Sequence, residues 1–288
     1  MTSQWRDRLG RFGVWRPVTL ATPELAAHLE QLGFGAIWLG SSPDADLAIV
    51  DELLSATTSL IVGTSIVNIW KDDPAAVAAS YRRIEGAYPG RFVLGVGAGH
   101  PEATAEYSSP YQALADYVDR LTQDHVPAEG IVLAALGPRV LRLAAERTAG
   151  AIPYLVPPGH THQAREILGT DRLLAPEHKV VLDPDPEQAR ALGRRRVANP
   201  YLRLVNYTSN LRRLGFADAD LAGSGSDRLI DALVAHGTAE QVAAQLGAHL
   251  DAGADHVVVQ LLTSAGADPL PGYAELARGL GLTNDGTD

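Results

Sequence analysis

Short apolar runs alternate with amphipathic segments along most of the chain. Each of eight runs rich in Val, Ile, Leu and aromatic residues is followed by a segment with helical spacing. Continuous apolar strands that alternate with helices are typical of a parallel sheet buried on both faces. Eight such units predict an α/β fold, the (β/α)8 TIM barrel. The expected strands are 12–15, 35–40, 60–67, 92–97, 131–136, 151–156, 179–182 and 256–262.

Several of the intervening helices begin with recognisable signals. A threonine or aspartate at the N-cap accepts hydrogen bonds from the first backbone N–H groups, and proline suits the first helical position. These signals predict helix starts at Thr22-Pro23, Asp73-Pro74, Gly137-Pro138 and Thr238.

One long segment interrupts the alternation. More than seventy residues separate Leu182 from His256, and most of them have helical patterns. We interpret approximately residues 184–236 as a helical insertion after strand seven of one barrel domain that spans 1–288. The insertion is either a lid over the active site or an element that only extends packing or a dimer face.

The fourth expected strand loses its side chains on one face. In the stretch FVLGVGAGHPE, Gly95, Gly97 and Gly99 occupy alternate positions and His100 follows them. A bare strip of backbone lets a flat ligand approach closely, and it places His100 at the barrel rim. The spacing differs from the G-x-G-x-x-G pattern of dinucleotide-binding folds. The alternative is a glycine-rich turn with a surface histidine.

The turn after the fifth strand has the features of an anion site. Gly137 precedes Pro138 at the start of a helix, where free N–H groups and the helix dipole attract negative charge. Arg139 adds a positive charge. The alternative is an ordinary tight turn between strand and helix.

Aromatic residues gather near the ends of the early strands. Trp15, Trp38 and Trp70 would line a flat apolar pocket there, or else pack in the core. Beyond strand six, His160 and His162 stand two residues apart and cannot share a helix face, so we predict no metal site.

Composition excludes several classes of protein. The 288 residues carry a formal net charge of −10, which argues against a nucleic-acid-binding protein. There is no cysteine, so disulfides and thiolate metal sites are excluded. No apolar run approaches the roughly 20 residues that span a bilayer. We expect a cytoplasmic protein that acts on a small molecule and does not bind membranes.

Three stretches together resemble a known family. GTSIV on strand three, RFVLGVGAGH on strand four and LAALGPRVLRLAAERTAG at strand five are similar to the bacterial luciferase-like (LLM class) oxidoreductases. Within that family the chain resembles the branch that uses the deazaflavin coenzyme F420. The resemblance extends from Phe12 to about Leu262, and it implies the same barrel fold.

The resemblance also implies roles for individual residues. In that branch a non-prolyl cis peptide in strand three supports the coenzyme ring, and the matching bond here joins Ser65 to Ile66. His100 occupies the position of a catalytic glutamate in related dehydrogenases and is the expected proton carrier. The positions that match coenzyme contacts are Ser65, Ile66, Asn68, Ala98, Gly99, Leu136, Gly137, Arg139 and Val140.

The substrate side differs from the sugar-phosphate dehydrogenases of this family. Their Asp-His pair at the end of strand two is replaced by Gly40–Pro43, and Pro157 stands where they have a lysine. A sugar phosphate is therefore not the expected substrate. We expect substrate contacts from Trp15, Trp38, Ser41, Trp70 and Tyr154.

The expected function is hydride transfer between F420 and an uncharged small organic substrate such as an alcohol, carbonyl, imine or alkene. One alternative is an FMN-dependent luciferase-like monooxygenase that uses O2. A second is a non-catalytic barrel that carries a coenzyme or has a structural role. The resemblance further implies a homodimer, which the apolar segment Asp46–Ala56 would permit.

Overall fold

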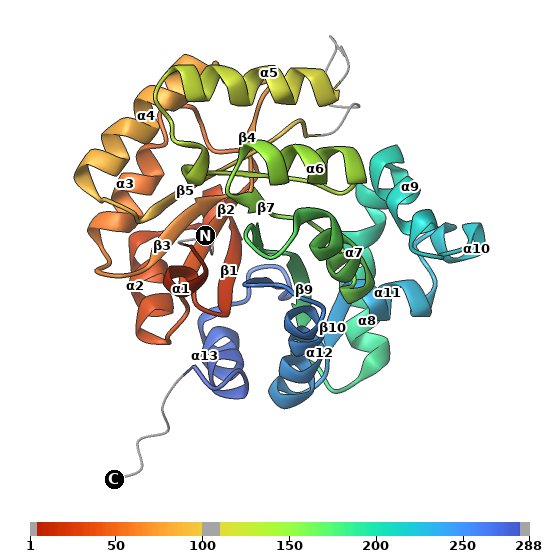
Figure 1. Ribbon diagram of the computed structural model, residues 1–288. Coiled ribbons are helices and arrows are strands. Elements are labelled where there is room, and N and C mark those ends of the chain that lie inside the picture. The colour runs from red at the N-terminus through yellow and green to blue at the C-terminus, as the bar shows by residue number, and fades with distance from the viewer. Residues whose placement is uncertain (1–4, 100–109, 283–288) are drawn as a thin grey trace.

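The computed structural model describes residues 5–99 and 110–282. Its strands curl around a central axis, and most of its helices surround them (Figure 1). The strands are β1 (Phe12–Pro17), β2 (Ala36–Gly40), β3 (Ile61–Thr64), β4 (Val67–Asn68), β5 (Phe92–Gly97), β6 (Ile131–Leu133), β7 (Gly150–Ala151), β8 (Leu173–Leu174), β9 (Glu177–Val181), β10 (Val234–His236) and β11 (Val257–Leu261).

The helices connect these strands in the order expected of a barrel. Helix α2 follows Thr22, α4 follows Asp73 and α12 follows Thr238, and each of these N-cap side chains accepts a backbone N–H as predicted. The helices are α1 (Trp5–Leu9), α2 (Pro23–Gln31), α3 (Ala48–Ser55), α4 (Pro74–Ala87), α5 (Pro110–Gln123), α6 (Pro138–Arg147), α7 (Pro158–Leu168), α8 (Pro186–Ala198), α9 (Val205–Arg213), α10 (Asp218–Leu221), α11 (Asp227–Leu233), α12 (Ala239–Asp251) and α13 (Leu270–Gly279).

The sheet is parallel and closes on itself. Its strand order is β10-β9-β11-β1-β2-β3-β5-β6-β7-β8, with β4 beside β5. The ring is completed because β8 and β9 are two parts of one extended stretch. Between them, the N–H groups of Ala175 and Glu177 donate to the carbonyls of Ala151 and Pro153, at 2.9 and 2.8 Å. The predicted (β/α)8 barrel is confirmed.

Several strands differ from their predicted limits. The third, expected over 60–67, is divided into β3 and β4, and the fifth, expected over 131–136, ends at Leu133. The sixth strand, expected over 151–156, is only Gly150–Ala151, because Pro153 has no N–H to donate to a neighbouring strand. The seventh begins earlier than 179, as β8 and β9. This early start was not predicted, because charged residues are not expected in a buried strand. Glu177 and Lys179 are nevertheless buried inside the barrel and pair with each other at 3.0 Å.

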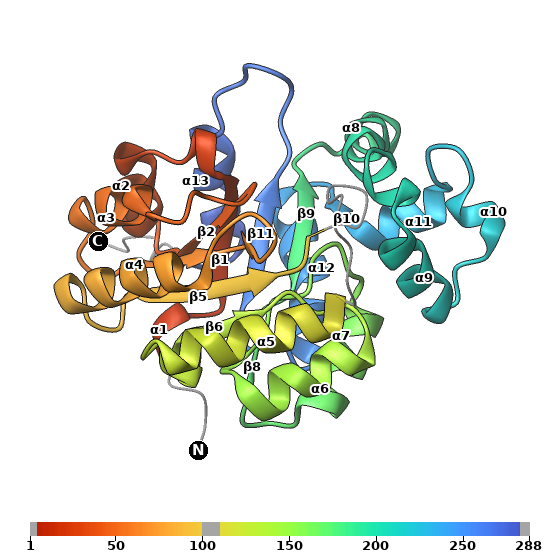
Figure 2. The same ribbon diagram turned by 90° about the horizontal axis from the view of Figure 1, so that it is seen from above.

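Helices α8 to α11 form the insertion after the seventh barrel strand. Figure 2 shows them together at one side of the barrel. They have an apolar core of their own, in which Leu211 and Ile230 pack in one cluster with Val181 on β9 and Val234 on β10. The insertion is therefore attached to the barrel through the carboxyl half of β9.

A separate cluster fills the barrel interior, and Trp38 lies in it. Its indole N–H donates to Nε2 of His256 at 3.1 Å, and Nδ1 of His256 donates to the carbonyl of Gly10 at 2.8 Å. Helix α1 contributes Trp5 and Leu9 to this cluster. Trp38 and His256 are fully buried, so the ring pair is part of the packed interior.

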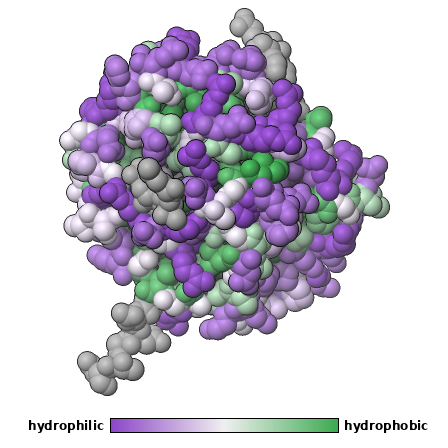
Figure 3. All heavy atoms as spheres, in the orientation of Figure 1, coloured by the Kyte–Doolittle hydropathy of each residue, from purple (hydrophilic) through white to green (hydrophobic). Residues whose placement is uncertain are grey.

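Polar and charged side chains cover most of the face drawn in Figure 3, with apolar residues in small patches between them. Within residues 5–99 and 110–282, none of the helices combines the length and the apolar character needed to cross a membrane.

Burial affects the titration of the interior histidines. Desolvation lowers the pKa of His256 to about 4, against a partial opposing effect of its bond to Gly10. Desolvation also lowers the pKa of His178 to about 4. Both rings are therefore neutral in the folded protein at pH 7. In the unfolded chain they take up protons below about pH 6.5.

We predict that the free energy of unfolding falls as the pH is lowered from about 6.5 towards 4, because the unfolded chain then binds more protons. Each such histidine contributes up to about 3 kcal/mol across that window. Urea unfolding at several pH values measures it. His256→Asn should flatten the curve, and His162→Asn, an exposed control on α7, should not. Equal curves for His256→Asn and the unaltered protein would contradict this account.

Candidate active site

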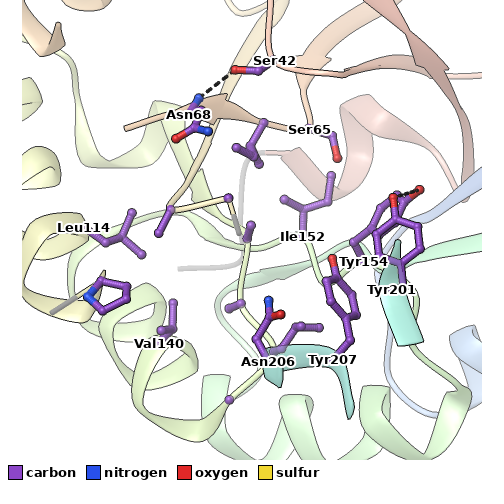
Figure 4. A pocket seen from close by; sticks show the side chains of 18 of the residues that line it. Ser42, Ser65, Asn68, Leu114, Val140, Ile152, Tyr154, Tyr201, Asn206 and Tyr207 are labelled. Atoms are coloured by element: carbon purple, nitrogen blue, oxygen red, sulfur yellow. Dashed lines mark hydrogen bonds between the residues drawn. The ribbon is translucent and has the colours of Figure 1, made fainter. Parts of the chain in front are cut away.

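A cavity of about 500 Å³ opens at the carboxyl ends of the barrel strands. Ser41 follows β2, Ser65 follows β3, Ala98 follows β5 and Ile152 follows β7, and all four border the cavity. Figure 4 shows Ser65 and Ile152 among the lining residues. Active sites of (β/α)8 barrels lie at this end.

The β3–β4 segment forms one wall. The peptide bond between Ser65 and Ile66 is cis, as the resemblance implies. Asn68 is held at both its backbone and its side chain. Its N–H donates to Ser42 Oγ at 3.1 Å, and its Oδ1 accepts the N–H of Trp70 at 3.0 Å. The remaining amide group, Nδ2, faces the next wall at Gly99.

The three glycines of the fourth barrel strand have different roles. A side chain on Gly95 would overlap the carbonyl oxygen of Thr64 on β3. A Cβ on Gly97 would lie 2.9 Å from the Ala134 Cβ. These two glycines therefore admit neighbouring strands and not a ligand. Gly99 does border the cavity, and its φ of +60° is one that glycine adopts without strain.

The start of α6 forms the end of the cavity at Leu136, Gly137 and Val140. Gly137 is the N-cap, and as a glycine it has no side chain to cap the first N–H groups. Leu136 is held by α7, because His160 Nε2 donates to its carbonyl at 2.8 Å. The helix terminus thus presents uncapped donors next to the cavity.

Sequence reasoning missed a cation at this end. Arg213 lies at the end of α9 in the insertion, and its guanidinium is 3.7 Å from where a Cβ on Gly137 would be. It donates to Asn210 Oδ1 at 3.0 Å, which leaves Asn210 Nδ2 buried without a partner among the described residues. Nothing in the sequence spacing connects 213 with 137. The predicted cation, Arg139, instead stacks 4.4 Å from the ring of Tyr111.

At the other end of the cavity, the Trp15 ring lies against Gly40, the last residue of β2. A side chain on Gly40 would overlap its indole ring, so only glycine leaves the room that this ring needs. The indole N–H donates to Ser65 Oγ at 3.2 Å. The ring centre is 5.7 Å from that of Tyr154. Trp15 therefore connects the β3 wall to the aromatic wall.

The aromatic wall continues from the barrel into the insertion. The ring centres of Tyr154 and Tyr201 are 5.4 Å apart, and those of Tyr201 and Tyr207 are 4.9 Å apart. The Tyr201 hydroxyl donates to that of Tyr154 at 3.1 Å, which donates to Gln260 Oε1 at 2.9 Å. Tyr201, Asn206 and Tyr207 show that the insertion contributes part of the cavity lining.

A buried ion pair supports this wall from behind. Lys179 Nζ is 4.0 Å from the centre of the Tyr154 ring and pairs with Glu177. Burial lowers the pKa of Lys179 and raises that of Glu177, while each charge opposes the shift of the other. Burial also raises the pKa of Tyr154 well above its ordinary value. The hydroxyl therefore stays protonated at neutral pH.

The described lining of the cavity contains no Lys, Arg, His, Asp or Glu. Among the described residues, cations lie just beyond this lining: Arg213 near Gly137, Arg139 against the Tyr111 ring, and Lys179 against the Tyr154 ring, where Glu177 neutralises it. In the described part of the chain, no three His, Asp or Glu side chains are grouped so as to hold a metal ion. The cavity therefore suits a ligand that is neutral over most of its length and anionic at the α6 end.

Most of the residues singled out from the sequence lie together, but three of the described ones do not line this cavity. Trp38 is in the barrel interior, Trp70 lies outside the lining, and Arg139 lies behind Tyr111. His100 falls outside the described residues. The predicted residues that border the cavity are Trp15, Ser41, Ser65, Ile66, Asn68, Ala98, Gly99, Leu136, Gly137, Val140 and Tyr154.

Comparison with known proteins identifies relatives of this architecture. A model of the luciferase-like monooxygenase family matches residues 17–256. No curated protein sequence matches the chain.

Solved structures share the fold at low sequence identity. An F420-dependent secondary alcohol dehydrogenase, solved with an F420-acetone adduct, has a TM-score of 0.74 at 16% identity, over 99% of this chain and 100% of that one. The F420-dependent tetrahydromethanopterin reductase of Methanopyrus kandleri has a TM-score of 0.65 at 16% identity, over 93% of this chain and 97% of that one. The oxygenating constituent of 3,6-diketocamphane monooxygenase from Pseudomonas putida, solved with FMN, has a TM-score of 0.65 at 14% identity, over 93% of this chain and 96% of that one.

We predict that Gly40→Ala destabilises the protein by about 1–3 kcal/mol, because the new methyl group displaces the Trp15 ring. Gly86→Ala is the matched control, since a Cβ on Gly86 in α4 meets no atom within 4 Å. It should raise stability by up to about 1 kcal/mol. Urea unfolding measures both. Unchanged stability of Gly40→Ala would show that the Trp15 ring does not need this space.

Proposed function

The chain belongs to the luciferase-like monooxygenase family, and from this premise we propose that it is an F420-dependent oxidoreductase. It would transfer a hydride between F420 and an uncharged small organic substrate. The observation that carries the proposal is the pairing of Arg213 with the uncapped start of α6, at one end of a cavity that lacks charge elsewhere in its described lining. This pairing suits a coenzyme with a flat neutral ring and an anionic tail.

The residues present fit such a coenzyme. The first N–H groups of α6 and the Arg213 guanidinium would hold its phosphate. Asn210, which accepts a hydrogen bond from Arg213, has a buried Nδ2 without a partner among the described residues. Bare backbone at Ala98 and Gly99 would lie against the ring, opposite Ile66. These are general features of anion and ring binding, and FMN shares both requirements.

When bound, the deazaflavin supplies the carbon centre that accepts or donates the hydride. The protein supplies position and a site with little water. The aromatic wall would hold the substrate against the ring. His100, which follows Gly99 in the sequence, remains the predicted proton carrier, because an imidazole exchanges protons near neutral pH.

The second candidate is an FMN-dependent monooxygenase, which the family model and the FMN-bound neighbour favour. Separate titrations of the purified protein with F420 and with FMN distinguish the two. We expect F420 to bind with a Kd below about 100 μM, or about −5.5 kcal/mol, and FMN to bind more weakly. Tighter binding of FMN together with O2-dependent turnover would establish the second candidate instead. Failure of both to bind would support a non-catalytic barrel.

We predict that Arg213→Gln weakens F420 binding by about three- to tenfold, because an ionic contact to the tail is lost. The difference from the unaltered protein should shrink at 0.5 M salt, since screening weakens exposed charge contacts. Arg212→Gln is the matched control. Arg212 is the adjacent arginine, but it pairs with Asp218 at 2.8 Å. Equal effects of the two substitutions would mean that only overall charge matters.

A further inference from the structure

We propose that the Trp15 end of the cavity is a subsite for an uncharged ring-bearing carbonyl compound or alcohol, whose oxygen accepts a hydrogen bond from Ser65. The proposal rests on the function given above and narrows its substrate class. It makes Ser65 a residue that touches the substrate. Trp15 has two roles in it: the indole N–H positions the Ser65 hydroxyl, and the ring forms part of the wall of the subsite.

The hydrogen bonds of Ser65 determine the direction of its hydroxyl. An indole N–H can only donate, so Ser65 Oγ accepts from Trp15. The serine hydrogen must then point elsewhere, and none of the described residues accepts it. The backbone of Ser65 is fixed, because its N–H donates to the carbonyl of Leu39 at 2.7 Å. Figure 4 shows Ser65 at the edge of the cavity, on the side where Tyr154 and Tyr201 lie.

The Ser65 hydroxyl is held in place before any ligand binds. Trp15 is 8% exposed, and its ring is confined between the end of β2 at Gly40 and the ring of Tyr154. A tryptophan this restricted fixes the serine oxygen to which it donates. A preorganised donor contributes more to binding than a mobile one, since less entropy is lost when it engages.

The walls next to this donor favour an uncharged ring. Trp15, Tyr154, Tyr201 and Tyr207 form a continuous series of rings with centre-to-centre distances of 5.7, 5.4 and 4.9 Å. Aromatic rings pack well against a further ring in tilted or offset geometry. The nearest charges behind the wall, Lys179 and Glu177, neutralise each other. A charged substrate would therefore lose hydration without gaining a counter-ion.

The direction of the Ser65 hydroxyl separates the possible substrates. A carbonyl or alcohol oxygen can accept its hydrogen. An alkene cannot, and on binding it would cover this half-buried donor without satisfying it, at a cost of about 1–3 kcal/mol. Carbonyl compounds and alcohols are thus favoured over alkenes.

The test uses acetophenone labelled with 13C at the carbonyl, added to the full-length protein with and without F420. A hydrogen bond to the carbonyl moves its 13C resonance downfield. We expect this shift with the unaltered protein. Ser65→Ala should abolish the shift and weaken acetophenone binding by about three- to tenfold. Trp15→Phe should reduce the shift while a ring remains to pack against the ligand. Ser55→Ala, at an exposed serine on α3, is the control and should change neither.

Three results would overturn the proposal. The first is an unchanged carbonyl shift in Ser65→Ala. The second is equal binding of 4-acetylbenzoate and acetophenone, which would contradict the preference for an uncharged ligand. The third is a loss of F420 affinity in Ser65→Ala as large as the loss of acetophenone affinity, which would assign the hydroxyl to the coenzyme. In each case the F420 titration of the unaltered protein decides separately whether the proposed function stands.

Discussion

The contact between Trp15 and the bare backbone of Gly40 is the constraint on which the substrate end of the cavity depends. A large ring occupies a place that any other residue at position 40 would fill. From there it reaches the next strand segment through Ser65 and the aromatic wall through Tyr154. The absence of a side chain at Gly40 on β2 thereby positions Ser65, which follows β3, and Tyr154, which follows β7.

The cavity changes in character along its length. Its α6 end has donors and the positive charge of Arg213, and its other end has tilted aromatic rings and hydroxyl groups. The pair Glu177 and Lys179 places charges inside the barrel without giving the aromatic end a net charge, because both belong to one face of β9 and lie within 3.0 Å of each other. A ligand with a neutral ring and an anionic tail is complementary to this gradient.

Local sequence patterns were sufficient for the barrel and for much of the cavity wall. The strands were recognisable because parallel strands are apolar on both faces, and helix starts such as Thr22 carry their signal within four residues. The cis bond at Ser65 came from resemblance to a family, since residue propensities there are ordinary. The early start of the seventh strand was not predicted. Its charged residues Glu177 and Lys179 have the sequence pattern of an exposed segment, although they form a buried ion pair. The position of Arg213 could not be predicted from local sequence, because only the folded insertion brings it close to Gly137.

Helix α9 borders both ends of this cavity. It carries Tyr207 in its first turn and Arg213 in its last, and its nine residues span about 13 Å. A rigid rod of this length cannot move at one end independently of the other. We therefore expect occupancy of the aromatic end and occupancy of the α6 end to be thermodynamically linked through α9. Such linkage is reciprocal, so any gain in affinity that the coenzyme gives the substrate is returned to the coenzyme by the same factor.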